Sequence, residues 1–283
     1  MNQGTVCLTF DFDAISIWLS RNLTSPTPVS RGEFGVVAVP RILHLLEKKG
    51  IKTTWFIPGH TIDTYPDVCK EIARAGHEVA LHGYAHENNT KLDAKTEEEI
   101  LIKSLDSFRN ILNVEPKGYR APAWDFSPHT VGILQKYQIS YDSSLMGHDY
   151  QPFYCRTGDN ITWDKGVEFG EETDIVELPV SWSLDDYPQF EYVRMENLLM
   201  PGLRSADSVF ENWTDDVRYM LRDFENGVLV ATFHPQVIGR GHRMLGLEKW
   251  LDELQTLPVR FERMDTICEK VKSGDIFGKY NPI

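Results

Sequence analysis

Short apolar runs alternate along this chain with stripes of apolar residues at helical spacing. Residues 5–12 form the first run and are predicted to be a strand. Side chains of a strand point alternately to its two faces, so Asp11 and Asp13 share one face, whereas Phe10 and Phe12 share the other. Two carboxylates therefore point the same way where this strand ends.

The alternation continues through the rest of the chain. Further strands are predicted at residues 52–57, 76–81, 118–120, 139–142, 175–178 and 228–233, and near residue 259. Helices are predicted at about residues 39–49, 66–75, 96–112, 206–224 and 245–254, with a last one ending near residue 272. Strands that alternate with helices are typical of a parallel sheet or barrel. With 283 residues, the chain is expected to be a single catalytic domain, residues 1–283, with loop insertions.

Two segments interrupt this rhythm. Residues 21–35 contain two prolines and two glycines and are predicted to be an irregular lid or substrate loop. Residues 145–173 show no clear periodicity, and the alternatives for this long loop are a substrate contact and a contact between copies in a homo-oligomer. Together with residues 182–186, both segments are expected to gather at the barrel mouth and narrow it.

Charge and composition limit the partners. A net charge of −13 without a basic cluster argues against nucleic acid and against an anionic membrane surface. Residues 1–4 contain no basic region or apolar run, and no stretch reaches membrane-spanning length, so a cytoplasmic protein with no membrane partner is expected. The four cysteines are scattered, which favours reduced, buried thiols over disulfides.

Two histidines follow another predicted strand. His82 and His86 come after residues 76–81, at the carboxyl end where parallel α/β folds place their chemistry. Such a pair alone is a weak signal, because this spacing also arises by chance. Two imidazoles, a carboxylate and one open position are nevertheless the ligands of a catalytic zinc ion. If one carboxylate binds metal and the other acts as a base, the set suits metal-assisted hydrolysis; spacing alone leaves both role assignments of Asp11 and Asp13 open.

Two further polar residues end predicted strands. The guanidinium of Arg120 could hold a buried carboxylate ionised and oriented, and the alternative is a structural ion pair. His234 could act as a general acid towards a leaving amine, and the alternative is a structural histidine. His77, at the amino end of its strand, is interpreted as structural.

The segments at residues 9–13, 82–86, 120–122 and 229–234 resemble, in this order, four motifs of the polysaccharide deacetylase family, which is the NodB-homology group or carbohydrate esterase family 4. The resemblance covers residues 6 to about 235 and implies a distorted (β/α)₇ barrel. It implies that a divalent metal, commonly zinc, is held by Asp13, His82 and His86. It also implies that Asp11 is the base, that Arg120 orients this base, and that His234 is the acid.

The first motif departs from the usual family pattern, because Phe12 separates two aspartates that most members have side by side. This variant resembles a subgroup of peptidoglycan deacetylase-like proteins, cyclic imidases and metal-independent allantoinases, as do residues 30–35, 86–88 and 182–186. The usual fourth motif, an aspartate and a tryptophan that tune the catalytic histidine, is not apparent. Asp142 and the pair Asp185 and Asp186 are the alternatives for the missing aspartate.

The resemblance predicts a metal-dependent hydrolase of a non-peptide amide bond. The first hypothesis is an N-deacetylase of N-acetylated carbohydrate. The alternative is a hydrolase of a small cyclic amide or imide, which the expected narrow mouth favours over a polymer substrate. A third hypothesis, a catalytically silent metal-binding or interaction protein on the same scaffold, is the weakest, because the predicted ligands, base and acid are all present together.

Overall fold

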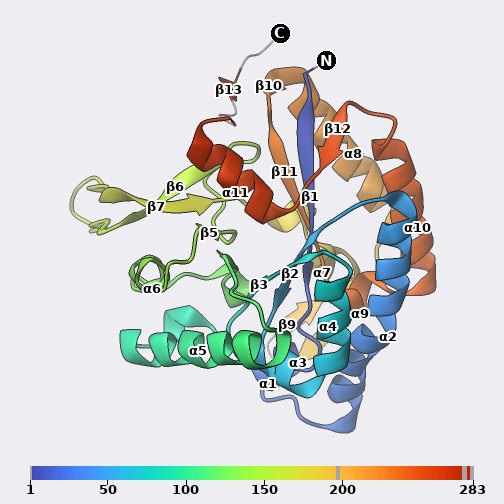
Figure 1. Cartoon of the computed structure of the whole chain (residues 1–283), viewed down its shortest axis with the longest axis horizontal. Helices are drawn as coiled ribbons and strands as arrows, with labels where there is room; N and C mark the ends of the chain where they lie inside the picture. Colours follow the sequence, from blue (N-terminus) through green and yellow to red (C-terminus); the bar gives the residue numbers. More distant parts are fainter. Residues whose placement is uncertain (1, 196–197, 276–278, 281–283) are drawn as a thin grey trace.

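The protein is described here by a computed structural model that covers residues 2–195, 198–275 and 279–280. Its centre is a curled sheet of parallel strands, with helices packed on the outer face (Figure 1). The seven parallel strands that form the curl are β1 (Gly4–Asp11), β2 (Thr54–Ile57), β3 (Glu78–Leu81), β4 (Gly118–Tyr119), β5 (Tyr141–Asp142), β7 (Glu171–Glu177) and β11 (Val228–Phe233). This arrangement confirms the predicted distorted barrel.

The order of the strands brings the two ends of the sheet towards each other. The sheet runs β11-β1-β2-β3-β4-β5-β7 and ends in the antiparallel strand β6 (Phe153–Thr157), while β12 (Val259–Phe261) joins the beginning of β1. A single parallel bridge between Asp185 and Thr232 links the segment after β7 to β11. The curl is therefore drawn together near the carboxyl ends of its strands.

The remaining elements lie around this sheet. The helices are α1 (Ser16–Leu19), α2 (Pro26–Lys49), α3 (Gly59–Thr64), α4 (Pro66–Arg74), α5 (Ala94–Ser107), α6 (Thr130–Lys136), α7 (Asp186–Phe190), α8 (Ala206–Asp223), α9 (Pro235–Ile238), α10 (Gly241–Leu254) and α11 (Met264–Ser273). Short turns of helix occur at η1 (Asn89–Lys91), η2 (Phe108–Leu112), η3 (Pro122–Trp124) and η4 (Trp182–Leu184). Two small antiparallel two-stranded sheets pair β8 (Val193–Met195) with β9 (Leu198–Met200), and β10 (Phe224–Glu225) with β13 (Lys279–Tyr280).

The alternation predicted for the first strand is confirmed. Phe10 and Phe12 belong to the apolar layer between the sheet and the outer helices, whereas Cys7 packs with the side chains inside the curl. Asp11 and Asp13 have the same parity as Cys7 and point inwards at the carboxyl end. Among the described residues, none of the helices is both long and apolar enough to cross a membrane.

The prediction of an irregular loop at residues 21–35 is wrong beyond residue 25, because α2 begins at Pro26. Proline is favoured at the first helical position, where no backbone donor is needed. The two glycines lie inside the helix and allow close packing. A Cβ on Gly32 would lie 2.5 Å from the carbonyl oxygen of Ala14, and a Cβ on Gly35 would lie 3.1 Å from the Phe12 ring. These close contacts of α2 with Ala14 and Phe12 explain why glycine occurs at both positions, and the sequence pattern does not reveal them.

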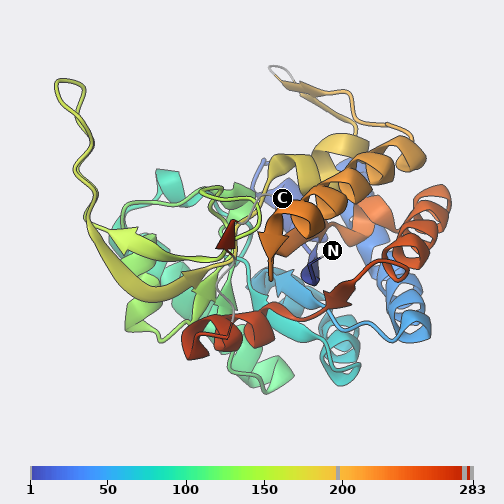
Figure 2. The same cartoon turned by 90° about the horizontal axis from the view of Figure 1, so that it is seen from above.

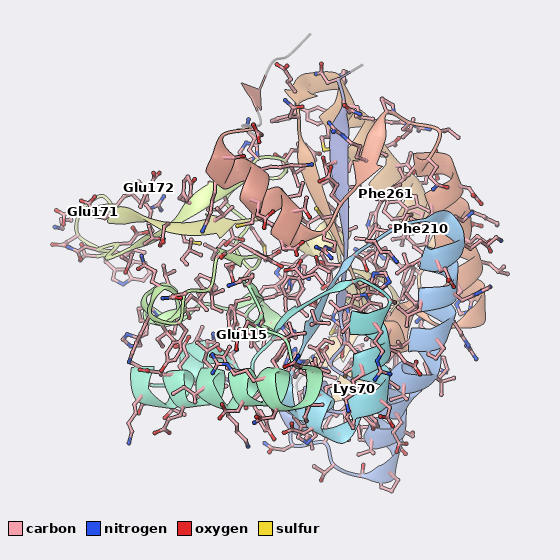
Figure 3. The ribbon with its side chains drawn as sticks, viewed as in Figure 1. Lys70, Glu115, Glu171, Glu172, Phe210 and Phe261 are labelled. Atoms are coloured by element: carbon pink, nitrogen blue, oxygen red, sulfur yellow. The ribbon has the colours of Figure 1, made fainter. Side chains whose placement is uncertain are left out.

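The prediction that residues 145–173 lack regular structure is also wrong. They include β6, which forms an antiparallel hairpin with β7. The hairpin is a long arm that projects sideways from the body (Figure 2), and Glu171 and Glu172 lie along it (Figure 3). Trp163, near its tip, is 107% exposed. Of the three segments expected to narrow the mouth, residues 21–35 are therefore mostly helix and residues 145–173 mostly a projecting hairpin, which leaves residues 182–186.

Several helix ends have clear physical causes. Pro66 begins α4, as predicted, and Gly50 ends α2 in the left-handed conformation with φ of 68°. The helix predicted to begin near Thr96 starts at Ala94, because the side chain of Asp93 caps it by accepting from the Thr96 backbone N–H at 2.8 Å.

Candidate metal and hydrolytic site

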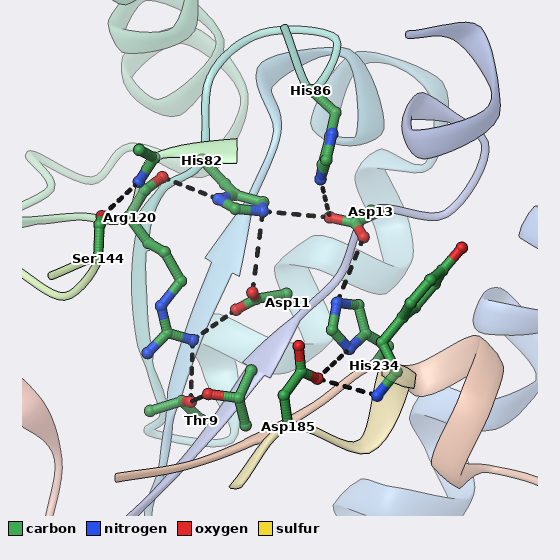
Figure 4. Close-up of polar contacts among 12 residues, drawn as sticks. Thr9, Asp11, Asp13, His82, His86, Arg120, Ser144, Asp185 and His234 are labelled. Carbon is green, nitrogen blue, oxygen red and sulfur yellow. Dashed lines mark hydrogen bonds and ion pairs between the residues drawn. The ribbon is translucent and has the colours of Figure 1, made fainter. Parts of the chain in front are cut away.

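The six residues singled out in the sequence meet at the carboxyl ends of four strands (Figure 4). They are Asp11 at the end of β1 and Asp13 just beyond it, His82 and His86 after β3, Arg120 after β4, and His234 after β11. All six are buried. Parallel strands in register bring residues that are far apart in the sequence to one edge, which explains why the convergence was predictable.

Three of these residues form a group that could hold a metal ion. One donor atom from each of Asp13, His82 and His86 lies within 4.8 Å of the others. The distance from Asp13 Oδ1 is 3.4 Å to His82 Nε2 and 3.9 Å to His86 Nε2. Both carboxylate oxygens of Asp13 are buried without a hydrogen-bond partner in the described part of the chain. A buried carboxylate without donors is costly, so this arrangement fits a bound cation.

The protonation states also suit a metal. Burial alone would raise the pKa of Asp13, but the neighbouring His86 and His82 outweigh burial and lower this pKa to about 2. Burial lowers the pKa of His86 to about 4, and the charges of His82 and Arg21 act in the same direction against that of Asp13. At neutral pH the site therefore offers an ionised carboxylate and a neutral imidazole, the forms in which both bind metals.

The two histidines are held in place by different means. His82 Nδ1 donates to the Arg120 carbonyl at 2.8 Å, a partner that assigns a proton to Nδ1 and leaves Nε2 facing Asp13 as the metal-binding nitrogen of the neutral ring. His86 has a left-handed backbone with φ of 61°. The carboxylate of Glu87 accepts from the backbone N–H groups of Tyr84 and Ala85, which fixes the preceding turn. Unusual backbone angles of this kind are concentrated at functional sites.

Asp11 is the second carboxylate, and Arg120 fixes it. Arg120 Nη1 donates to Asp11 Oδ1 at 2.7 Å and to Thr9 Oγ1 at 3.0 Å. The Nε and Nη2 groups of Arg120 donate to the carbonyl and hydroxyl oxygens of Ser143 at 2.9 and 2.8 Å. Asp11 Oδ2 lies 3.9 Å from His82 Nε2, so the second oxygen faces the candidate metal group.

A buried support for this guanidinium was not anticipated from the sequence. Glu177 Oε1 accepts from the backbone N–H groups of Ser144 and Leu145, each at 3.0 Å. Ser144 Oγ accepts from the Ala121 N–H at 2.8 Å and donates to Asp142 Oδ1 at 3.0 Å. Burial and the adjacent Glu177 raise the pKa of Asp142 well above its usual value, so the carboxyl pair holds a proton. Asp142 therefore stabilises the loop that positions Arg120, and it does not contact His234.

His234 is held by the other candidate, the pair Asp185 and Asp186. Asp186 Oδ1 accepts from His234 Nδ1 at 2.8 Å and from its backbone N–H at 2.9 Å, while Asp185 Oδ1 lies 3.4 Å from Nδ1. His234 Nε2 faces Asp13 Oδ2 at 3.7 Å. Burial alone would lower the pKa of His234, but the charges of Asp185 and Asp186 outweigh burial and raise this pKa to about 10.

Aromatic residues border the mouth. The ring of Trp182 stacks on Trp124 with centroids 4.2 Å apart and is 46% exposed. Tyr187 lies with its ring 5.1 Å from that of His234. Of these three residues, only Trp182 lies in a segment that the sequence motifs single out, and the sequence assigns a role to none of them. Tyr187 directly follows Asp186 in the chain, and this adjacency is the signal that could have found it.

His77 accepts from the Thr53 N–H at 3.1 Å, which confirms its structural interpretation.

Known proteins match this chain over most of its length. The family model for polysaccharide deacetylases matches residues 1–141. A peptidoglycan deacetylase of Helicobacter pylori is 37% identical over 257 residues, covering 86% of this chain and 87% of that protein. A Mycobacterium smegmatis crystal structure assigned to the polysaccharide deacetylases is 32% identical, with a TM-score of 0.86 over 100% of this chain and 94% of the other.

An allantoinase crystal structure has a TM-score of 0.77 over 96% of this chain and 91% of its own, but only 18% identity, so it shows likeness of fold alone. The Helicobacter and Mycobacterium relatives are similar in sequence as well as in fold. This chain therefore belongs to the polysaccharide deacetylase family, and it is a hydrolase of non-peptide amide C–N bonds.

Proposed function

We propose that this chain is a metal-dependent N-deacetylase of N-acetylated carbohydrate, with Asp13, His82 and His86 as the metal ligands. The observation that carries the proposal is the buried carboxylate of Asp13, which has no hydrogen-bond donor among the described residues and faces two imidazoles. One carboxylate oxygen and two imidazole nitrogens form a donor set that suits Zn²⁺ and leaves room for substrate. Zinc is therefore the ion that we propose.

The remaining residues divide the chemistry among them. A bound divalent ion would polarise the acyl carbonyl and lower the pKa of a water molecule. Asp11, whose Oδ1 is held by Arg120, accepts the proton of the attacking water through its other oxygen. His234, kept protonated by Asp185 and Asp186, donates a proton to the departing nitrogen. The amide C–N bond breaks, a C–O bond forms, and the products are acetate and a free amine.

The aromatic residues at the barrel mouth favour a sugar over a cyclic imide as the substrate. The half-exposed face of Trp182, stiffened by its stack on Trp124, offers a flat apolar surface of the kind on which the C–H face of a sugar ring packs. The relative from Helicobacter pylori is named a peptidoglycan deacetylase, which supports a substrate containing N-acetylated amino sugars. No observation favours a cyclic imide, because the allantoinase likeness is limited to the fold and the expected capping loops are a helix and a projecting arm.

The test compares two substrate classes in one preparation. Zinc-loaded protein is incubated with short N-acetylglucosamine oligomers, with peptidoglycan fragments, and with small cyclic imides, and acetate release and ring opening are measured. Asp11→Asn is the inactive control. We expect acetate release that depends on Asp11. Ring opening without acetate release would contradict the proposal and establish the imide hydrolase in its place.

A further inference from the structure

The guanidinium of Arg21 lies near the proposed site and has no assigned role. Arg21 follows α1 in the segment between β1 and α2, and its backbone N–H donates to the Trp18 carbonyl at 3.2 Å. The next residue, Asn22, adopts a left-handed φ of 57°, which closes the turn. Arg21 is therefore fixed in a tight turn, eight residues beyond Asp13 along the chain.

The side chain of Arg21 contacts Tyr187, which lies next to the proposed acid His234. Its Nη1 donates to the hydroxyl of Tyr187 at 2.7 Å, and its guanidinium carbon lies 5.4 Å from the Tyr187 ring centroid and 5.5 Å from that of Trp18. The Tyr187 ring in turn lies 5.1 Å from the ring of His234. Two aromatic faces and one hydroxyl thus hold a cation one residue away from the reacting groups.

Arg21 differs from its neighbour Arg31 in what it pairs with. Arg31 also lies over Trp18, at 4.5 Å, but it forms an ion pair with Glu191 and donates to the Tyr192 carbonyl. Within residues 2–195, 198–275 and 279–280, no carboxylate lies within 4.0 Å of the Arg21 guanidinium.

We propose that Arg21 is the anchor of a carboxylate-binding site at the mouth of the barrel, an inference that rests on the proposed deacetylation. A guanidinium has five N–H donors in a planar fork, and in the described structure only one group, Nη1, is engaged, by Tyr187. The remaining edge suits a carboxylate, which can accept two parallel hydrogen bonds. The aromatic faces restrict the guanidinium, so little side-chain freedom is lost when the carboxylate binds.

Two sources can supply this carboxylate. Deacetylation creates one in the site, because the acyl carbon gains an oxygen and leaves as acetate. A sugar substrate can also bring one, as in N-acetylmuramic acid, which is N-acetylglucosamine with a lactyl carboxylate close to the acetamido group. Both sources use the same chemistry at Arg21, so the experiment has an arm for each.

The experiment measures binding rather than turnover. Dissociation constants of acetate, N-acetylglucosamine and N-acetylmuramic acid are measured by ligand-observed NMR titration on the zinc-loaded protein and its Arg21→Gln and Arg31→Gln variants. We expect Arg21→Gln to weaken at least one of the two acids by about tenfold relative to the neutral sugar, the range of a lost charge-assisted hydrogen bond. Arg31→Gln is the matched control, since it removes an equal charge next to the same Trp18 ring, and its acid-to-neutral ratio should not change.

The outcomes separate the sources and the hypotheses. A loss confined to acetate assigns Arg21 to the product, and a loss for the acidic sugar assigns it to the substrate. Equal effects of the two variants, or a ratio changed less than twofold by Arg21→Gln in a sample that melts as the wild type does, would overturn the proposal. Tyr187→Phe keeps the guanidinium but removes its anchor, and we expect a smaller loss for the same acid. Arg21-dependent binding in a protein that releases no acetate would refute the proposed function and leave the binding site standing.

Discussion

Arg120 Nη1 donates to Asp11 Oδ1 at 2.7 Å, and both side chains are buried. The other donors of Arg120 are held by Ser143, so the cation cannot turn away from Asp11. This leaves the second oxygen of Asp11 facing His82 and Asp13. In this geometry one oxygen of Asp11 is held by Arg120 and the other is free to accept a proton at the proposed metal site, which is what a general base requires.

Replacing Arg120 by glutamine should disable this base without removing the metal. Asp11 then loses the hydrogen bond that holds its Oδ1, so kcat/KM should fall by roughly 10²-fold, the range for a misplaced catalytic group, while the metal content stays that of the wild type. Arg120→Lys keeps a charge but not the fork, and its kcat/KM should lie between those of the two proteins. An unchanged kcat/KM in Arg120→Gln would show that Arg120 does not orient the base.

His234 should be necessary for turnover and dispensable for metal binding. We expect His234→Gln to lower kcat by roughly 10² to 10⁴ while the metal content stays that of the wild type, since a general acid contributes in this range. The exposed His129→Gln is the control and should change neither quantity. In Asp186→Asn the hydrogen bond to His234 is weakened and the pKa of His234 should fall, so the basic limb should move to lower pH. Near-normal turnover in His234→Gln would remove it from the mechanism.

Glu78 at the amino end of β3 should make the folded state sensitive to pH. Burial, aided by the charge of Asp265, raises the pKa of Glu78 to about 7. The folded protein therefore binds more protons than the unfolded chain between about pH 4 and pH 7, and this contribution to stability is lost as pH rises through that window.

Glu78→Gln cannot ionise, so its free energy of unfolding relative to the wild type should improve between pH 5 and pH 8, by on the order of 3 kcal/mol. Denaturant unfolding at both pH values measures this difference. The exposed Glu269→Gln is the control and should show no such trend. A Glu78→Gln difference that is the same at both pH values would mean that Glu78 ionises normally in the folded protein.

Gly32 should tolerate no side chain. A Cβ there would lie 2.5 Å from the backbone oxygen of Ala14, which cannot move without shifting the turn after Asp13. Overpacking of this kind costs about 1–3 kcal/mol, more than the roughly 1 kcal/mol that alanine gains over glycine in a helix. We therefore expect Gly32→Ala to lower the melting temperature. Gly132→Ala in α6 meets no atom within 4 Å and should be neutral or stabilising; equal effects of the two changes would refute the packing argument.

The sequence predicted what depends on strand parity and strand ends. Asp11 and Asp13 had to share a face, and His82, Arg120 and His234 each follow an apolar run, so a parallel sheet brings them to one edge. The support behind them was not predictable in this way. Glu177 contacts the loop at Ser144 only because β5 and β7 are neighbours, and nothing in either segment alone indicates that pairing.

The errors have a similar cause. The pattern around Gly32 predicts irregular chain, whereas this glycine lets α2 approach the turn at Ala14, a contact between separate segments. Residues 145–173 show no clear periodicity, yet β6 pairs with β7 because the edge of the sheet is available to it. The choice between Asp142 and Asp186 likewise depended on which carboxylate comes near His234 in space, and the bridge from Asp185 to Thr232 decides it.

The most direct test of the account is a paired measurement on Asp11→Asn: metal content by elemental analysis, and acetate release in the same sample. We expect about one zinc ion per chain, as in the wild type, because the ligands Asp13, His82 and His86 are intact. We expect acetate release to fall by at least about 10³, because the base is gone. Loss of the ion with Asp11, or normal acetate release without the Asp11 carboxylate, would contradict the division of roles at the centre of this account.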